Sequence, residues 1–306
     1  MKTTLQQISY GGWVKCLQLS DGKTELVVTT NVGPRIIRCA VAGGTNLLKE
    51  FTDQLGRTGG KSWTIYGGHR FWVAPEDRTR TYAPDNEPVP WSWSGRVLRL
   101  VQHPDRVAGL QKVLEISMAN GTVTLCHTLV NRSRKSRRVA PWSLTVMAPG
   151  GCAVVPQEAY GSHERNLRPV RPLVLWKYTN MDDPRWRWGR KFVLLKQDRK
   201  ATRPQKAGFL STPAWMAYLL PHATLVKRHG YQPGATYPDM GCNAELFTNH
   251  EMLELESVAP LVDLKPGAHI RHVETWRVFP TGIRDRSEAN LTRKLLPLVA
   301  KTRPAV

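Results

Sequence analysis

The chain has 306 residues, with 44 Lys or Arg against 24 Asp or Glu, so its formal net charge is +20. Hydrophobic residues make up 41% and charged residues 22%, which is typical of a folded globular chain and excludes a disordered one. No apolar run approaches the roughly 18 residues that a membrane-spanning helix needs. Residues 1–12 contain no apolar segment typical of a secretory signal. We therefore expect a cytoplasmic protein that does not enter a membrane.

Five cysteines lie scattered along the chain without a CxxC pair. An odd number of isolated cysteines does not fit a disulfide scaffold or a Cys-rich zinc site. The chain also has no Walker sequence and no GxGxxG, GxSxG or HExxH motif, which argues against nucleotide-binding enzymes, serine hydrolases and zincins. We expect reduced thiols, no metal and no cofactor.

Short β-branched or alternating segments separated by turn residues recur along the chain. In chain order they predict strands at residues 24–30, 35–41, 107–118, 122–130, 139–147, 152–156, 173–178, 192–196, 215–220, 252–257 and 269–279. Asn120-Gly121 separates two of these runs and is a strong hairpin signal. We predict an all-β fold, a large antiparallel β-supersandwich with few short helices, as a single domain over residues 1–306. A short helical tail is expected at about 286–301, interrupted by Pro297.

Two runs concentrate positive charge. Residues 131–138 read NRSRKSRR, and residues 185–191 read RWRWGRK, where arginines alternate with tryptophans. Such alternation is typical of single-stranded nucleic-acid binders, because bases stack on rings while arginine neutralises phosphate. A solvated hairpin tip for the first run and a half-buried strand end for the second are the favoured interpretations, because charged runs commonly form solvated faces. Nucleic acid therefore remains an alternative partner.

The segment 63–77 combines aromatic rings, a Gly-Gly pair, a histidine, an arginine and two carboxylates. Sugars bind to such mixtures because their C–H faces stack on rings while their hydroxyls need donors and acceptors. A tight turn with core tryptophans is the structural alternative. We predict that one wall of a ligand site consists of Tyr66, His69, Arg70, Trp72 and Glu76.

Further candidate side chains come later in the chain. Glu254 and Glu256 alternate with leucines in a predicted strand, so both carboxylates point to one face. That face is either exposed to solvent or, if the strand lies mid-sheet, lines a concave surface. Asp183 and Arg185 lie in a turn-rich loop and are candidate sugar ligands. His272 and Glu274 also share a face, where a His–Glu hydrogen bond is expected rather than a metal site.

Several of these segments together resemble the galactose mutarotase-like superfamily, which contains the aldose 1-epimerases. They are the opening 31–37 (NVGPRII), 66–72 (YGGHRFW), the central 142–145 (WSLT) and the turn 264–267 (LKPG) before the last strand. The resemblance runs from about residue 20 to 280. It is strongest to a bacterial branch with a YGGHR-x-W-x-APED segment, rather than to the epimerases themselves.

The resemblance implies a sugar-binding cleft and acid–base sugar isomerisation. The epimerases use a glutamate base and a histidine acid, and the matching base here is Glu256, with Glu254 as the alternative. Where the family has its histidine, this chain reads Pro141-Trp142-Ser143-Leu144-Thr145, so His69 is the candidate acid. The expected ligand is a small sugar or a sugar acid, because arginine forks bind carboxylate or phosphate. A non-catalytic sugar-binding or regulatory module is the alternative.

Overall fold

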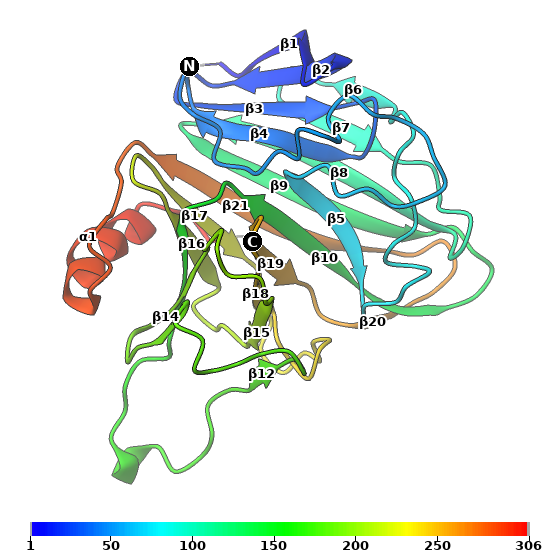
Figure 1. Cartoon of the computed structure of the whole chain (residues 1–306). Coiled ribbons are helices and arrows are strands. Elements are labelled where there is room, and N and C mark those ends of the chain that lie inside the picture. The colour runs from blue at the N-terminus through cyan, green and yellow to red at the C-terminus, as the bar shows by residue number, and fades with distance from the viewer. Residues whose placement is uncertain (1, 305–306) are drawn as a thin grey trace.

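The computed structural model describes residues 2–304, which form two large antiparallel sheets and a short helix. The first sheet has 11 strands (Figure 1). Across that sheet the strands follow the order β1 (Thr4–Tyr10), β2 (Trp13–Ser20), β3 (Thr24–Thr29), β4 (Arg35–Val41), β5 (His69–Ala74), β10 (Arg137–Met147), β19 (Leu253–Val258), β18 (Ala244–Thr248), β15 (Gln205–Phe209) and β12 (Leu173–Leu175), with β20 (Val262–Leu264) paired to β10.

The second sheet has 10 strands. Their order is β13 (Trp186–Trp188), β14 (Phe192–Lys196), β11 (Cys152–Pro156), β16 (Trp215–Leu219), β17 (Thr224–His229), β21 (His269–Phe279), β9 (Thr122–Asn131), β8 (Leu110–Ala119), β7 (Val97–Val101) and β6 (Trp91–Trp93). The all-β prediction is confirmed. The sequence patterns missed mainly the first two strands and several that flank the site, including β5, β15 and β18.

The β8–β9 hairpin forms where Asn120-Gly121 predicts it. Both residues have positive φ, 53° and 79°, while Ala119 pairs with Thr122. A two-residue hairpin turn with φ above zero at both positions matches the right-handed twist of the flanking strands, which is why Asn-Gly favours it.

The main hydrophobic core lies between the two sheets. It is built from the inward-facing side chains of both sheets, among them Leu26, Ile36, Leu114, Leu125, Met216, Leu246, Leu255 and Trp276. A second apolar cluster covers the outer face of the 10-stranded sheet, where Leu291, Leu295 and Val299 of the helix pack against Val154, Trp215 and Val226. All five cysteines are buried and free.

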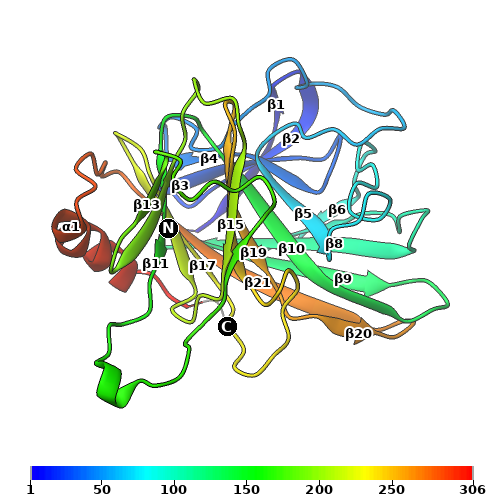
Figure 2. The same ribbon diagram turned by 60° about the horizontal axis from the view of Figure 1, so that its bottom comes forward.

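The helix α1 spans Glu288–Ala300 and lies at one side of the molecule in both views (Figures 1 and 2). Ser287 caps it by accepting a hydrogen bond from the Asn290 backbone N–H. The expected interruption at Pro297 is wrong, because the helix continues through Pro297 to Ala300. Its buried leucines and valine anchor the last turn on the sheet. No helix in residues 2–304 is long and apolar enough to cross a membrane.

Candidate functional site

Strands β5, β10 and β19 lie side by side in the middle of the 11-stranded sheet (Figure 2). Leu144 of β10 is opposite Arg70 on one side and Glu256 on the other, and Trp142 is opposite Trp72. Directly opposite residues share a face of the sheet. The outer face, away from the main core, therefore carries Arg70, Trp72, Glu254 and Glu256. Glu254 and Glu256 lie in the middle of the sheet, which is the second of the two alternatives that the sequence pattern left open.

A cluster of charged side chains, which we call the outer cluster, occupies this face: Arg70, Lys206, Glu245, Glu254 and Glu256. Arg70 Nη1 lies 2.8 Å from Glu254 Oε1. Lys206 Nζ bridges two carboxylates, at 2.7 Å from Glu245 Oε2 and 3.0 Å from Glu256 Oε2. Each of these five residues is at most 5% exposed.

The outer cluster contains three carboxyl groups and two cations. Burying an uncompensated charge is costly, so the cluster favours keeping one proton on a carboxyl group. Burial raises the pKa of Glu245 well above its usual value, against the attraction of Lys206, and also raises the pKa of Glu254. Burial by itself would lower the pKa of Lys206, but Glu245 and Glu256 raise it well above its usual value.

Aromatic rings surround the outer cluster on two sides. On the β5 side, the Arg70 guanidinium lies 4.3 Å from the centre of the Trp72 ring and 5.4 Å from that of Trp63. On the β15 side, Lys206 Nζ lies 4.9 Å from the ring centre of Trp142 and 4.7 Å from that of Trp176. These contacts are cation–π interactions, and the rings exclude water from the charges.

Four buried polar atoms on this face have neither a hydrogen-bond partner nor an ion-pair contact within residues 2–304. They are Glu256 Oε1, Arg70 Nε, Trp63 Nε1 and Trp72 Nε1. The other oxygen of Glu256 accepts from Trp142 Nε1 at 3.1 Å and from Lys206. An unsatisfied buried polar group costs about 1–3 kcal/mol, so four of them in one place need an explanation. Bound hydroxyl groups would satisfy both the acceptor and the donors.

The rim of this face carries two tyrosines and Glu76. The Tyr82 hydroxyl donates to Glu76 Oε1 at 2.6 Å, and its ring packs edge-on against Trp63 and Trp72. An open hollow of about 620 Å³ lies beside these residues, lined by Glu76, Asp77, Arg78 and Tyr82. Tyr178 follows Trp176 by two residues on the β15 side; burial raises its pKa, Lys206 opposes this shift, and Glu256 and Glu76 add to it.

The predicted wall of five residues is split by the structure. Arg70 and Trp72 face the outer cluster, and Glu76 reaches the rim. His69 points through the sheet to the opposite face, because consecutive strand residues alternate, and it is fully buried there. Tyr66 packs into a neighbouring cluster, where its ring contacts Trp13 and its hydroxyl donates to Asn86. The expectation that His69 and Tyr66 share a wall with Arg70 is therefore wrong.

His69 belongs to a buried polar network between the sheets, here called the inner network. His127 Nδ1 lies 3.1 Å from the His272 carbonyl, so it carries the proton and its Nε2 accepts. His69 Nε2 must then donate to His127 Nε2, at 2.8 Å, and His69 Nδ1 accepts from Thr145 Oγ1 at 3.0 Å. Lys227 Nζ in turn donates to Thr145 Oγ1 at 2.9 Å. This chain assigns both imidazoles as neutral.

Glu274 balances the charge of Lys227 in the inner network. Its Oε1 lies 2.8 Å from Lys227 Nζ, and both groups are fully buried. Burial would raise the pKa of Glu274, but Lys227 holds it well below its usual value. The expected His272–Glu274 hydrogen bond is wrong, because Ser257 Oγ lies between them, 2.6 Å from His272 Nε2 and 2.5 Å from Glu274 Oε1.

Three ligand atoms of the inner network lie within 4.8 Å of one another, one each from His69, His127 and Glu274. Their geometry suits a metal ion, but their hydrogen bonding does not. The two imidazole nitrogens bond to each other, and the carboxylate is already paired with Lys227. A divalent cation would have to break both interactions beside a buried ammonium group. The inner network fits a structural role better than a metal centre.

Asp183 and Arg185 bind each other instead of facing the outer cluster. Arg185 Nε and Nη2 donate to the two Asp183 oxygens at 2.9 and 2.8 Å. The hydrogen bonds from Arg185 lower the pKa of Asp183. Arg185 also donates to the Arg203 carbonyl at 2.6 Å, so the pair closes a loop. No contact in the described structure joins this pair to Glu254 or Glu256.

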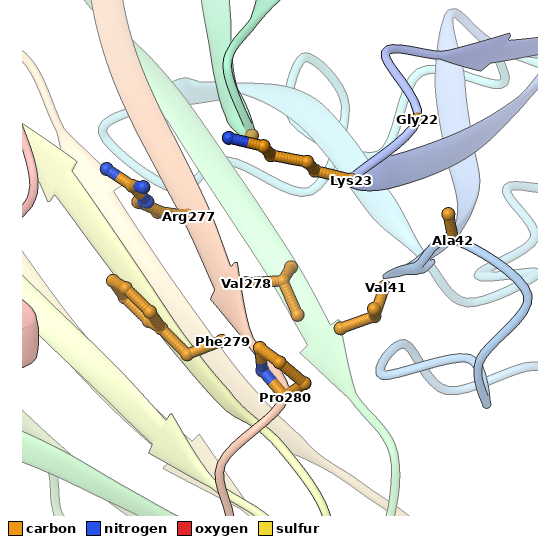
Figure 3. A pocket seen from close by; sticks show the side chains of 9 residues that line it. Gly22, Lys23, Val41, Ala42, Arg277, Val278, Phe279 and Pro280 are labelled. Carbon is orange, nitrogen blue, oxygen red and sulfur yellow. The ribbon is translucent and has the colours of Figure 1, made fainter.

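The basic runs differ in their surroundings. Arg132, Arg134, Lys135 and Arg138 are exposed at the turn between β9 and β10. In the second run, Trp186 is buried and stacks on Trp188 at 4.9 Å, so these rings face each other rather than solvent. A smaller hollow, about 290 Å³, has Lys23 and Arg277 beside the aliphatic Val41 and Val278 (Figure 3). Arg277 Nη1 there donates to the Lys301 carbonyl at 2.8 Å.

Sequence reasoning missed two of the five residues of the outer cluster and most of its aromatic surroundings. Lys206 lies in a short strand, QKAGF, that has no alternating pattern, and Glu245 lies in another, AELFT. Trp63 and Trp142 were noted only as parts of longer segments, and Trp176 and Tyr178 as part of a predicted strand. Their common location depends on strand order, which no local pattern encodes.

Solved structures of low sequence identity share this architecture. One solved structure is a TPR-domain containing protein from Parabacteroides distasonis, with 14% identity and a TM-score of 0.58. The match covers 89% of this chain and 48% of that protein, so this chain spans about half of that protein's length. Galactose mutarotase-like proteins from Clostridium acetobutylicum (10% identity, TM-score 0.53, 92% and 99% covered) and Lactobacillus casei (9%, 0.52, 86% and 100%) also match. No protein-family model and no curated protein sequence matches. The chain has the galactose mutarotase-like fold.

Proposed function

We propose that this protein binds an aldose or a sugar acid over the outer cluster and interconverts its anomers, with Glu256 as the base. The observation that carries the proposal is the free Oε1 of Glu256, buried without a partner beside three unpaired N–H donors. The fold and the aromatic surroundings of the cluster support the same ligand class. Lys206 and Trp142 hold the other oxygen of Glu256, which fixes the direction of the free one.

The chemistry is a proton exchange at a hemiacetal. The base takes the proton of the anomeric hydroxyl, the bond between C1 and the ring oxygen breaks, and an acid protonates the ring oxygen. Ring closure on the other face of the aldehyde reverses these proton transfers. Glu256 is fully buried, so a sugar must displace part of the aromatic cover to reach it.

The test combines binding and turnover. The purified chain is screened with D-glucose, D-galactose, D-glucuronate and glucose 6-phosphate, with binding followed by tryptophan fluorescence and anomer exchange by NMR. Glu256→Gln should lose about 100-fold or more in exchange rate while keeping affinity within a few-fold. Glu251→Gln, at an exposed carboxylate outside the cluster, should behave as wild type. Equal exchange rates in both variants contradict the role of Glu256.

A non-catalytic sugar-binding module is the second candidate. The observation that favours it is that no histidine of residues 2–304 contacts the outer cluster, since His69 lies on the other face. Such a module would bind one of the sugars saturably and give no anomer exchange above the uncatalysed rate. A basic protein associated with nucleic acid, the remaining alternative, would instead bind oligonucleotides with an affinity that falls steeply with salt.

A further inference from the structure

An anomer-exchanging site needs a proton donor opposite its base, and the outer cluster supplies few. Both oxygens of Glu245 are occupied, by Cys242 Sγ at 3.2 Å and Lys206 Nζ at 2.7 Å, and Glu254 is paired with Arg70 at 2.8 Å. Lys206 donates to two carboxylates, and the Tyr82 hydroxyl is taken by Glu76. Another O–H group is the phenol of Tyr178, two residues after Trp176, whose ring centre lies 4.7 Å from Lys206 Nζ; this phenol makes no hydrogen bond to residues 2–304.

A pinned turn holds Tyr178 beside the outer cluster. The turn 176–180 follows the edge strand β12, which pairs with β15. Thr179 Oγ1 donates to the Lys206 carbonyl, and the Asn180 N–H donates to Gln205 Oε1 at 2.9 Å. The Trp176 N–H donates back to Thr179 Oγ1 at 3.0 Å. These bonds attach the turn to the strand that carries Lys206, and the Trp176 ring lies on Lys206 itself.

We propose that Tyr178 is the proton donor of this site, acting on the ring oxygen of a sugar whose anomeric hydroxyl faces Glu256. The inference rests on the proposed function. Tyr178 is 42% exposed, whereas Glu256 is fully buried, so a sugar entering from solvent meets Tyr178 before it reaches Glu256. Base and acid then approach the sugar from opposite sides, from β19 and from the turn after β12.

The proton balance closes within the site. Glu256 accepts the proton of the anomeric hydroxyl, the C1–ring oxygen bond breaks, and Tyr178 gives its proton to the ring oxygen. The positive charge of Lys206, which acts to lower the pKa of Tyr178, stabilises the phenolate formed in this step. On ring closure the hydroxyl returns its proton to Tyr178, and Glu256 returns its own to the anomeric oxygen. No oxidant, metal or water is consumed.

The charges around the phenol keep it protonated at neutral pH. Burial raises the pKa of Tyr178 to about 12, Lys206 opposes this shift, and Glu256, Glu76 and Glu245 add to it. Tyr178 is therefore a donor over the whole range in which the protein is handled. A histidine donor would instead lose its proton near pH 6.5.

The experiment compares Tyr178→Phe with wild type on whichever of the four sugars is turned over. The expected result is a fall of about 100-fold or more in the anomer exchange rate at saturation, with the dissociation constant within about 3-fold of wild type. Wild-type exchange should also stay level between pH 7 and 10, since the donor does not titrate there. Tyr160→Phe is the matched control, because Tyr160 is 74% exposed and its ring contacts Arg190.

The outcomes separate the two proposals. If Glu256→Gln is inactive but Tyr178→Phe retains more than a third of the wild-type rate, Tyr178 is not the donor and the proposed function stands. A fall in the wild-type rate above pH 7 would also overturn the assignment, because the Tyr178 phenol stays protonated in that range. If the wild-type chain binds a sugar without exchanging it, both the catalytic function and the donor role fail.

Discussion

The strongest structural consequence of the outer cluster concerns Lys206. Its ammonium group is the shared partner of Glu245 and Glu256, and its side chain is 6% exposed. Lys206→Met keeps most of the volume but leaves two buried carboxylates without their cation. Breaking a buried ion pair by removing one partner costs about 3–5 kcal/mol, and here one cation serves two carboxylates. We expect the free energy of unfolding at pH 7 to fall by about 4 kcal/mol.

The loss should shrink in acid. Burial already raises the pKa of Glu245, and removing Lys206 removes the attraction that opposes this rise, so the folded variant binds more protons than the unfolded chain as pH falls. The variant therefore recovers stability relative to wild type between pH 7 and pH 5. Urea unfolding at several pH values measures this, with Lys200→Met, at an exposed lysine, as the control. A deficit below about 1 kcal/mol, or one independent of pH, would refute the reasoning.

Two further predictions concern the scaffold. Burial lowers the pKa of His272 to about 3, so its stabilising contribution is present above the unfolded pKa of about 6.5 and is lost as pH falls. Between pH 7 and 5 this histidine accounts for about 2 kcal/mol of the loss of stability. His272→Gln should therefore reduce the acid-induced loss by about that amount. If urea unfolding shows the same dependence of the unfolding free energy on pH in variant and wild type, the buried ring is not neutral. Gly68→Ala places a Cβ 2.1 Å from the Ile36 carbonyl oxygen at φ +68°, and should cost more than about 2 kcal/mol. Gly59→Ala, at φ +71° with open space around it, isolates the backbone cost, and equal losses in thermal unfolding would show that contact with Ile36 is irrelevant.

The local sequence pattern predicts the fold better than it predicts the site. The period of two at Leu253–Glu256 put both glutamates on one face, and Asn120-Gly121 fixed a hairpin, because both features depend on neighbours in the chain. His69 and Arg70 show the limit of the same reasoning. The density of functional residue types in segment 63–77 predicts one wall of a site. Alternation along β5 instead places the side chains of His69 and Arg70 on opposite faces of the sheet.

The partners of Glu256 could not be found from the sequence for a different reason. Lys206 precedes it by 50 residues and Trp142 by 114. They meet only because β10, β19, β18 and β15 follow one another across the sheet. Lys206 lies in no recognisable pattern and Trp142 lies in a predicted strand, but strand order is decided by packing over the whole sandwich rather than by local propensity. The role proposed for Tyr178 could not be inferred from the sequence either, because this residue lies in a turn that the pattern predicts as strand.

The outer cluster and the inner network lie on opposite faces of the sheet around β5, β10 and β19. In this arrangement the inner network helps to position the outer cluster. Lys227 Nζ donates to Thr145 Oγ1 of β10 at 2.9 Å and to the Leu255 carbonyl of β19 at 3.1 Å. Leu255 lies between Glu254 and Glu256, so its backbone position sets the direction of both carboxylates. Side chains that act in recognition need supports whose own geometry is fixed. A neutral, fully bonded histidine network supplies such a support without adding net charge beneath the outer cluster.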